Sequence, residues 1–311
     1  MKSVRIPLAI VLLLFIGTGV FYFVDPESRI KGLIAGEAKF QGRYASAWAK
    51  DLADSDDNRR TATKKTLAEG KAEALPMLTI LAQGSQPESV RLASAELIGQ
   101  LGAEGRSAAT VLIDMLNDPE QHIQTLAVKS LAKLAPDVPG AVPALVKKFP
   151  NVEAIRAVSA FKSSAAEAVA QLTELLTHQD VAVRWNAART LGKIGEPALS
   201  ALPVIVKQLG DPEPQVREHA AEAIGDIGPK AAAAIPDLVK VLKDPDTMVR
   251  KDAVRALGQM GPAAKSVIAD VSDLKKDKEK IVVDFATIAE RQIDPSLAGP
   301  KNQGRMPKSD D

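Results

Sequence analysis

A 33-residue repeat constrains the fold of this chain more than any other feature. A Val-Arg pair begins at positions 183, 216 and 249, so the period is 216 − 183 = 249 − 216 = 33. A period of this length is typical of solenoids, in which each unit packs only on its neighbours. Because repeat surfaces serve many unrelated functions, the repeat predicts the shape of the protein more strongly than its chemistry.

Apolar residues in each unit follow the spacing of one face of an α-helix, at the valine and four, seven, eight and eleven residues after it. In one unit these residues are Val216, Ala220, Ala223, Ile224 and Ile227. The same frame begins at Val90, Ile123, Val183 and Val249. Each unit therefore contains one amphipathic helix at a fixed position.

A second helix is predicted between successive copies of the first. Pro203 is followed by an apolar trio two, three and six residues later, and the pattern recurs at Pro143 and Pro236. Proline suits the first turn of a helix, where a missing amide hydrogen costs least. Glycine-containing joints end one helix, and Asp-Pro steps begin the next. The chain is therefore predicted to be an all-α stack of antiparallel helix pairs.

The frame D-P-x-x-x-V-R-x-x-A-A-x-A-L-G resembles the HEAT repeats, in the short Ala-rich subtype called phycobilisome-lyase-like. The resemblance is best over residues 180–262 and extends over 54–262. It implies a HEAT-type α-solenoid of about seven helix pairs. It also implies a structural ladder of aspartate and arginine side chains, here Asp54, Arg60, Arg91, Asp118, Arg184, Asp211, Arg217, Asp244 and Arg250. The pattern lapses where Gln124, Ser85 and His178 replace a ladder residue.

One unit is shorter than the others. Pro143 and Ala170 occupy equivalent positions, and 170 − 143 = 27, which is six short of the period of 33. We therefore expect truncated helix pairing around residues 150–165 and a change in the pitch of the superhelix.

The uncharged segment Ile6 to Val24 is predicted to be a transmembrane anchor or a signal sequence. Its nineteen residues, at roughly 1.5 Å per residue, match the hydrocarbon core of a bilayer. Lys2 and Arg5 precede it, which places the N-terminus in the cytoplasm and the solenoid outside it. We favour a retained anchor in the inner membrane over secretion after cleavage, because no A-x-A site follows the apolar run.

The remaining segments follow from these assignments. After residues 1–24 we expect a juxtamembrane linker over 25–43, the solenoid over 44–277, a C-terminal capping helix over 278–294 and a disordered tail over 295–311. The predicted apolar face of the capping helix contains Ile281, Phe285 and Ile288, with Ala289 as a further candidate.

No residue pattern indicates catalysis, a cofactor or a metal. The chain has no cysteine, and its three histidines are not at chelating spacing. The formal net charge of +1 gives no overall positive electrostatic field that would attract nucleic acid. The His-Glu pairs of the HEAT-like deoxyhypusine hydroxylases are missing, and no phosphate-binding loop or nucleophile elbow is found.

Protein partners are therefore predicted, and in HEAT repeats the second helix of each pair lines the concave docking face. Positions pointing away from the core on these helices form two rows whose charged and small side chains are typical of a solvated face. The candidate partner-binding residues are Leu92, Lys129, Trp185, Arg189, Glu218, Glu222, Lys251 and Arg255. Trp185 has two interpretations, an interface anchor beside Arg189 or a filler of the gap left by the shortened unit.

The sequence predicts a membrane-tethered scaffold or adaptor that is not an enzyme. The alternative is a HEAT-like bilin lyase or accessory enzyme acting on a partner protein, which rests on the family resemblance alone. A sensor of a peptide or polymer in the cell envelope is equally compatible with the sequence. The partner, the oligomeric state, the source organism and cleavage of the N-terminal segment are not determined by it.

Overall fold

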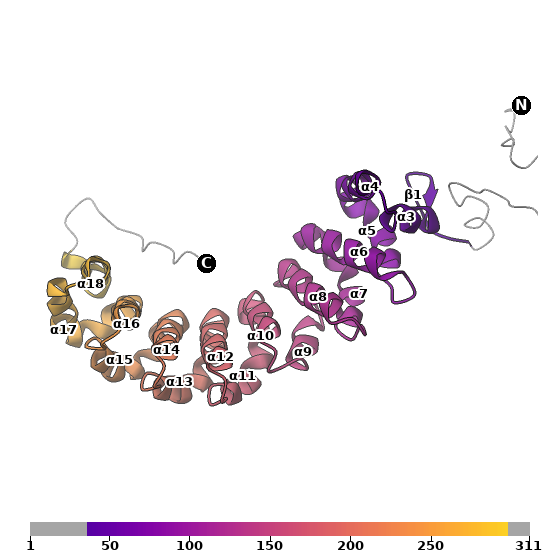
Figure 1. Ribbon diagram of the computed structural model, residues 1–311. Helices are drawn as coiled ribbons and strands as arrows, with labels where there is room; N and C mark the ends of the chain where they lie inside the picture. The colour runs from indigo at the N-terminus through magenta and orange to yellow at the C-terminus, as the bar shows by residue number, and fades with distance from the viewer. Residues whose placement is uncertain (1–35, 298–311) are drawn as a thin grey trace, which may run out of the picture.

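Antiparallel pairs of α-helices, stacked side by side in a curved row, form nearly all of residues 36–297, the part of the chain that this computed structural model describes (Figure 1). The first helices of the pairs are α3 (Ala45–Leu52), α5 (Lys71–Leu81), α7 (Ala109–Met115), α9 (Ala141–Val146), α11 (Val169–Leu175), α13 (Leu202–Gln208), α15 (Ile235–Val241) and α17 (Ile268–Asp273). The second helices are α4 (Asp57–Glu69), α6 (Glu88–Gln100), α8 (Gln121–Leu134), α10 (Val152–Ser159), α12 (Val181–Ile194), α14 (Pro214–Ile227), α16 (Thr247–Met260) and α18 (Lys280–Ile293). The predicted all-α repeat solenoid is confirmed.

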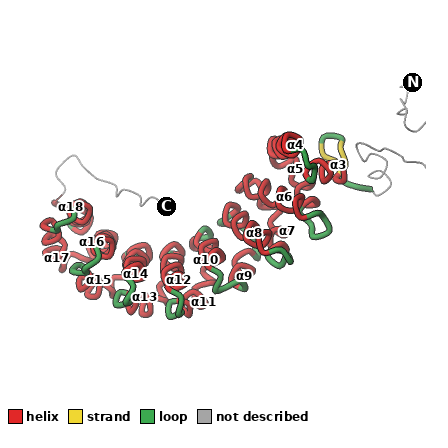
Figure 2. Tube along the Cα trace, viewed as in Figure 1, coloured by secondary structure: helices red, strands yellow, loops and turns green. Residues whose placement is uncertain are grey.

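The two helices of each pair occupy opposite sides of the curve. In Figure 1, α10, α12, α14, α16 and α18 lie on the inner side, and α9, α11, α13, α15 and α17 lie on the outer side. Figure 2 shows short loops joining the pairs, and short 3-10 segments precede several outer helices. Pro203 and Pro236 stand in the first turn of α13 and α15, as their lack of an amide hydrogen favours.

The repeat period extends further than predicted. Helices α12, α14, α16 and α18 begin at residues 181, 214, 247 and 280, each 33 after the last. The predicted capping helix is therefore the second helix of an eighth pair in the described residues. Its predicted apolar face was wrong at Ile281, which is 42% exposed, whereas Phe285 packs partly against the core. Ala289 is buried, together with Val282, Ala286 and Ile293. Those residues follow the repeat frame that begins at Val282, which the sequence analysis did not extend to this helix.

The shortened unit is confirmed, and its deficit lies in one helix. Helix α10 has 8 residues, whereas α8 and α12 on either side have 14 each. The difference of 14 − 8 = 6 equals the shortfall in the period. The inner helix of the fourth pair is therefore the element that was truncated.

Glycine allows the inner helices to approach one another closely. A Cβ atom added at Gly192 would lie 2.7 Å from the Cα of Ala223, and one added at Gly225 would lie 2.9 Å from the Cα of Ala256. The same contact recurs at Gly258. These glycines stand nine residues after the repeat valine, so a glycine-on-alanine contact joins α12 to α14, α14 to α16 and α16 to α18. Because both surfaces are backbone, any added side chain must push the helices apart.

A small β-hairpin covers the N-terminal end of the stack. Strands β1 (Lys39–Phe40) and β2 (Arg43–Tyr44) pair antiparallel, and the hairpin lies beside α3 in Figure 2. Phe40 is buried, and its ring lies 5.7 Å from that of Trp48. Residues 39–43, predicted as linker, are thus part of the folded body, and they supply the cover that a terminal unit needs.

Helix α18 departs from the repeat on the side that would face a further unit. The arginine of the Val-Arg pair is replaced by Val283, and the glycine nine residues after the valine is replaced by the exposed Arg291. The features that join α16 to α18 are therefore not repeated beyond α18.

None of the helices between residues 36 and 297 combines the length and the apolar character needed to cross a bilayer. The predicted anchor at residues 6–24 lies outside the described residues, as do most of the predicted linker and residues 298–311 of the tail.

Candidate functional site

The predicted partner-binding residues lie on inner helices, but several are not solvated. Glu222 and Lys251 are only 7% and 8% exposed, and the Arg255 side chain is 11% exposed. Leu92 packs partly against the apolar core, whereas Lys129 is exposed. The prediction of a solvated face is therefore wrong for Glu222, Lys251, Arg255 and Leu92. The reason is that side chains of neighbouring helices lie against each other and cover one another.

Glu222 on α14 is the centre of a charged cluster on this face. Its carboxylate accepts a hydrogen bond from Lys193 of α12 at 3.1 Å and lies 2.8 Å from Nδ1 of His219. Lys193 also donates to Asp226 at 3.0 Å, and Arg255 of α16 lies 3.8 Å from Glu222. Three consecutive inner helices thus contribute to one network. We call Lys193, His219, Glu222, Asp226, Asp252 and Arg255 the inner-face network.

The network sets the ionisation of its members. Burial raises the pKa of Glu222, but His219 and Lys193 outweigh it and lower that pKa to about 2. Burial lowers the pKa of Lys193, yet the carboxylates of Asp226 and Glu222 raise it above its ordinary value. The charged forms of Glu222 and Lys193 therefore stabilise each other.

The network continues along α16, where burial has the larger effect. Asp252 is 4% exposed, and it pairs with Arg255 at 3.1 Å and with Lys251 at 3.2 Å. Burial raises the pKa of Asp252 despite both cations. Burial also raises the pKa of the half-buried Glu218 on α14. At this end of the face, the nearby cations therefore do not fully offset the effect of burial on the pKa of the two carboxyl groups, Glu218 and Asp252.

Trp185 lies at the edge of the network and contacts the following unit. Its ring stacks on that of His219, with centroids 4.8 Å apart and planes inclined at 25°. The stacked partner belongs to α14, on the side away from the shortened α10. Arg189 lies one turn along α12 and is also half-buried. The contact of Trp185 therefore differs from that expected of a filler next to the short unit.

The Asp/Arg ladder links units through pairs at a constant separation in sequence. Arg184 and Asp211, Arg217 and Asp244, and Arg250 and Asp277 each form two hydrogen bonds of 2.8 to 3.0 Å. Arg91 and Asp118 form the corresponding pair between α6 and the loop before α8. Each rung therefore fastens one inner helix to the start of the next.

The same arginines also bind within their own unit. Arg217 and Arg250 donate to the backbone carbonyls of Asp211 and Asp244, which explains the six-residue spacing in the sequence. In the first unit Arg60 donates to the carbonyl of Asp54, and the Asp54 carboxylate pairs with Arg59.

Two kinds of residue in this site were missed by the sequence analysis. Asp277 completes the last rung, although its position one full period after Asp244 was available as a signal. Lys193 and Asp226 both stand ten residues after the repeat valine, and this shared register could have indicated that they meet. His219 pairs with Glu222 three residues along α14, and Asp252 pairs with Arg255 three residues along α16, so helical spacing was the available signal for these two.

Within residues 36–297 no group of three or more histidine, aspartate or glutamate side chains is arranged to hold a metal ion.

One family model and one of the two solved structures below agree with this architecture. Residues 150–202 and 202–289 match the family model of HEAT repeats. A solved structure described as an engineered protein of the Northeast Structural Genomics Consortium is 24% identical, with a TM-score of 0.53, over 86% of this chain and 81% of its own. A second engineered protein of that consortium is 25% identical, with a TM-score of 0.40, over 80% of this chain and 96% of its own. The first likeness shows the fold alone. No curated protein matches the chain.

Proposed function

We propose that this solenoid is a protein-binding scaffold that captures a partner on the inner face of α12, α14 and α16. The match of residues 150–289 to HEAT repeats supports protein binding in general. The inner-face network supports this location, because hydrogen bonds and ion pairs between the three helices already hold its side chains in place in the absence of a partner.

The arrangement of the inner-face network is the observation that carries the proposal. Association costs free energy when flexible side chains become ordered, roughly 0.5–1.5 kcal/mol for each long side chain. Lys193, Glu222 and Arg255 are already held by several ion pairs, so little of this cost remains. A face of this kind presents a fixed pattern of charges, which favours specificity for one partner over others.

Trp185 supplies the aromatic part of the proposed interface. Tryptophan and arginine are enriched among the residues whose truncation weakens binding by roughly 2 kcal/mol or more. The stack on His219 fixes the orientation of the indole, and Arg189 lies one turn away. We assign Trp185 and Arg189 as the anchor of the partner interface and assign no catalytic role to any residue.

The proposed scaffold is tethered to the inner membrane by residues 6–24, with the solenoid outside the cytoplasm. This part of the proposal rests on the apolar segment and its positive flank in the sequence. A tether raises the local concentration of the solenoid near membrane partners, which strengthens weak binding without new contacts.

A photo-crosslinking experiment tests the location of the partner. A photoreactive amino acid is placed at Gln215, exposed on α14 one turn before His219, or at Lys240, exposed on the outer helix α15. After illumination of native membranes, mass spectrometry identifies the captured protein. We expect a crosslinked partner from Gln215 and none from Lys240. Capture from Lys240 alone would place the interface on the outer face and refute the proposal.

Substitution of Trp185 separates an anchor from a filler. Trp185→Ala is expected to raise the dissociation constant of the captured partner by about tenfold or more. It is expected to lower the melting temperature only slightly, because one ring stack between α12 and α14 is lost. Lys240→Ala, an exposed change on the outer helix α15, serves as the control and leaves both quantities unchanged. A lower melting temperature with unchanged capture would show that Trp185 only fills space.

A further inference from the structure

One rung of the ladder is replaced by two amides. In each ladder pair the number of the aspartate exceeds that of the arginine by 27. Since 124 + 27 = 151, Gln124 and Asn151 stand where an arginine and an aspartate stand elsewhere. Gln124 lies on α8, and Asn151 precedes α10, the truncated helix. The described residues contain no hydrogen bond between these two side chains, so the rung that joins α6 to α8, α12 to α14, α14 to α16 and α16 to α18 is not made between α8 and α10.

Each of the two amides makes only the local half of a rung. Gln124 donates through Nε2 to the carbonyl of Asp118 at 2.7 Å, as Arg217 does to the carbonyl of Asp211. Asn151 accepts at Oδ1 from the backbone amide of Ala154 at 3.0 Å. These backbone partners fix which end of each amide is engaged. Oε1 of Gln124 remains as an acceptor and Nδ2 of Asn151 as a donor.

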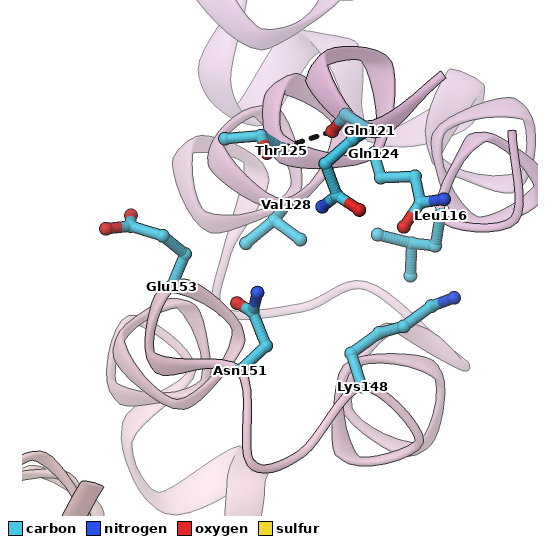
Figure 3. Close-up of a pocket in the computed structure, with 8 residues that line it drawn as sticks. All are labelled: Leu116, Gln121, Gln124, Thr125, Val128, Lys148, Asn151 and Glu153. Carbon is cyan, nitrogen blue, oxygen red and sulfur yellow. Dashed lines mark hydrogen bonds between the residues drawn. The ribbon is translucent and has the colours of Figure 1, made fainter. Parts of the chain in front are cut away.

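A cavity of about 160 Å³ lies where the rung is missing. Figure 3 shows the glutamines of α8 on one wall and Asn151 and Lys148 on the facing wall. At roughly 30 Å³ for each water, the volume corresponds to about five water molecules. That is enough for one planar group of four or five heavy atoms.

The wall residues select for a neutral ligand. Lys148 and Glu153 line the same cavity with opposite charges, so neither a lone anion nor a lone cation is favoured. The Lys148 amine is already engaged by the side-chain carbonyl of Asn117 at 3.0 Å. Leu116 and Val128 add an apolar surface. Across the cavity Gln124 thus offers an acceptor and Asn151 a donor, while the side chains of Gln121 and Thr125 add further polar groups to the wall.

We propose that this cavity is a binding site for a peptide group from an extended segment of a protein. The peptide N–H donates to Oε1 of Gln124, and the peptide C=O accepts from Nδ2 of Asn151. A peptide group is neutral and planar and carries one donor and one acceptor, as the unsatisfied ends of the two amides require. The site lies between α8 and α10 and shares no residue with the inner-face network. Its failure and that of the proposed function are therefore distinguishable.

The test uses N-acetylglycine N-methylamide as a model peptide and the full chain in detergent micelles. Saturation-transfer NMR observes the methyl signals of the probe, so the size of the protein is not an obstacle. We expect binding with a dissociation constant on the order of 10 mM, as is typical of ligands of this size. The analogue in which both amides are replaced by esters, methyl acetoxyacetate, cannot donate a hydrogen bond and is expected to bind about fivefold or more weakly.

Two variants make the test specific. Asn151→Asp keeps the acceptor for Ala154 and removes the donor, so probe affinity is expected to fall about tenfold with the fold preserved. The double variant Gln124→Arg with Asn151→Asp rebuilds a rung in the cavity. It is expected to abolish probe binding and to raise the melting temperature. Gln100→Arg, an exposed change on α6, is the matched control and leaves probe binding unchanged.

The proposal is overturned by either of two results. One is no saturation transfer to the probe with the natural chain at several times the expected dissociation constant. The other is equal transfer with the natural chain and with Asn151→Asp, because the probe then binds without the proposed donor.

Discussion

Replacement of Glu222 by glutamine removes the central charge of the inner-face network and keeps the size of the side chain. In the natural chain this carboxylate is held by His219 and Lys193 and lies near Arg255, while Asp226 competes for the same cations. A neutral amide retains some hydrogen bonding but loses the attraction to the cations. We therefore expect Glu222→Gln to destabilise the fold at neutral pH and to do so less in acid.

The size of the effect follows from the pKa of Glu222, which falls from 4.5 to about 2, a gap of 4.5 − 2 = 2.5. At roughly 1.4 kcal/mol for each pKa unit the gap corresponds to about 3.5 kcal/mol, and screening by solvent reduces this to about 2–3 kcal/mol. The folded-state pKa is depressed, so this stabilisation is complete above the unfolded pKa and is lost as the pH falls toward the folded pKa. At pH 3 about 1 kcal/mol remains.

Urea unfolding followed by circular dichroism, at pH 7 and at pH 3, measures this difference. The variant is expected to lose about 2–3 kcal/mol of unfolding free energy at pH 7 and about 1 kcal/mol at pH 3. Glu196→Gln is the control, because the Glu196 side chain is 62% exposed and its pair with Lys230 contributes little at the surface. If Glu222→Gln cost the same at both pH values, the charge of Glu222 would not be the source of its stabilisation.

Two further substitutions test how the units are joined. Arg217→Met leaves the Asp244 carboxylate, whose side chain is 6% exposed, without its paired cation. We expect the free energy of unfolding in urea to fall by about 2–4 kcal/mol, and adding Asp244→Asn to restore part of it. An unchanged midpoint of urea unfolding would contradict the inference that the ladder joins the units. Gly225→Ala forces a Cβ to within 2.9 Å of the Ala256 backbone, so the melting temperature should fall with a cost of about 1–3 kcal/mol. Gly84→Ala, with nothing within 4 Å of the new Cβ, should be nearly neutral, and equal effects at the two glycines would refute close packing as the cause.

The regular part of the fold was predictable because each unit repeats the same local signals. The frame beginning at Val183, Val216 and Val249 predicts α12, α14 and α16, and the shortened spacing predicts the truncated α10. These inferences need only the period of a helix and the residues that start and end it. Both kinds of information are local in sequence.

The inner face was not predictable in the same way. Helical periodicity shows that Glu222 and Lys251 point away from the apolar core, but it does not show that neighbouring helices cover them. Lys193 reaches Glu222 and Asp226 across 29 and 33 residues of sequence. Such a network depends on the spacing between helices, which the glycines that stand nine residues after the repeat valine set at close range.

The replaced rung was half visible in the sequence. The loss of arginine at Gln124 is evident from the repeat frame, but the matching Asn151 lies at the beginning of the shortened unit. Counted back one period of 33 residues from His178 in the following unit, the ladder position falls at residue 145, six residues before Asn151. Counted from Asp118, it falls at 118 + 33 = 151, in register with the ladder.

Helix α18 limits how this protein can be lengthened. A unit appended after Ile293 would meet the long side chain of Arg291 instead of a glycine. Val283 would donate no hydrogen bonds to the loop between the two helices of the appended pair, where the ladder aspartate stands in other units. A copy of residues 214–246 inserted before Thr247 would find matching surfaces on both sides, since the period is unbroken there. Growth of this architecture, in evolution or by protein engineering, is therefore expected through duplication inside the array, with the terminal helix carried along unchanged.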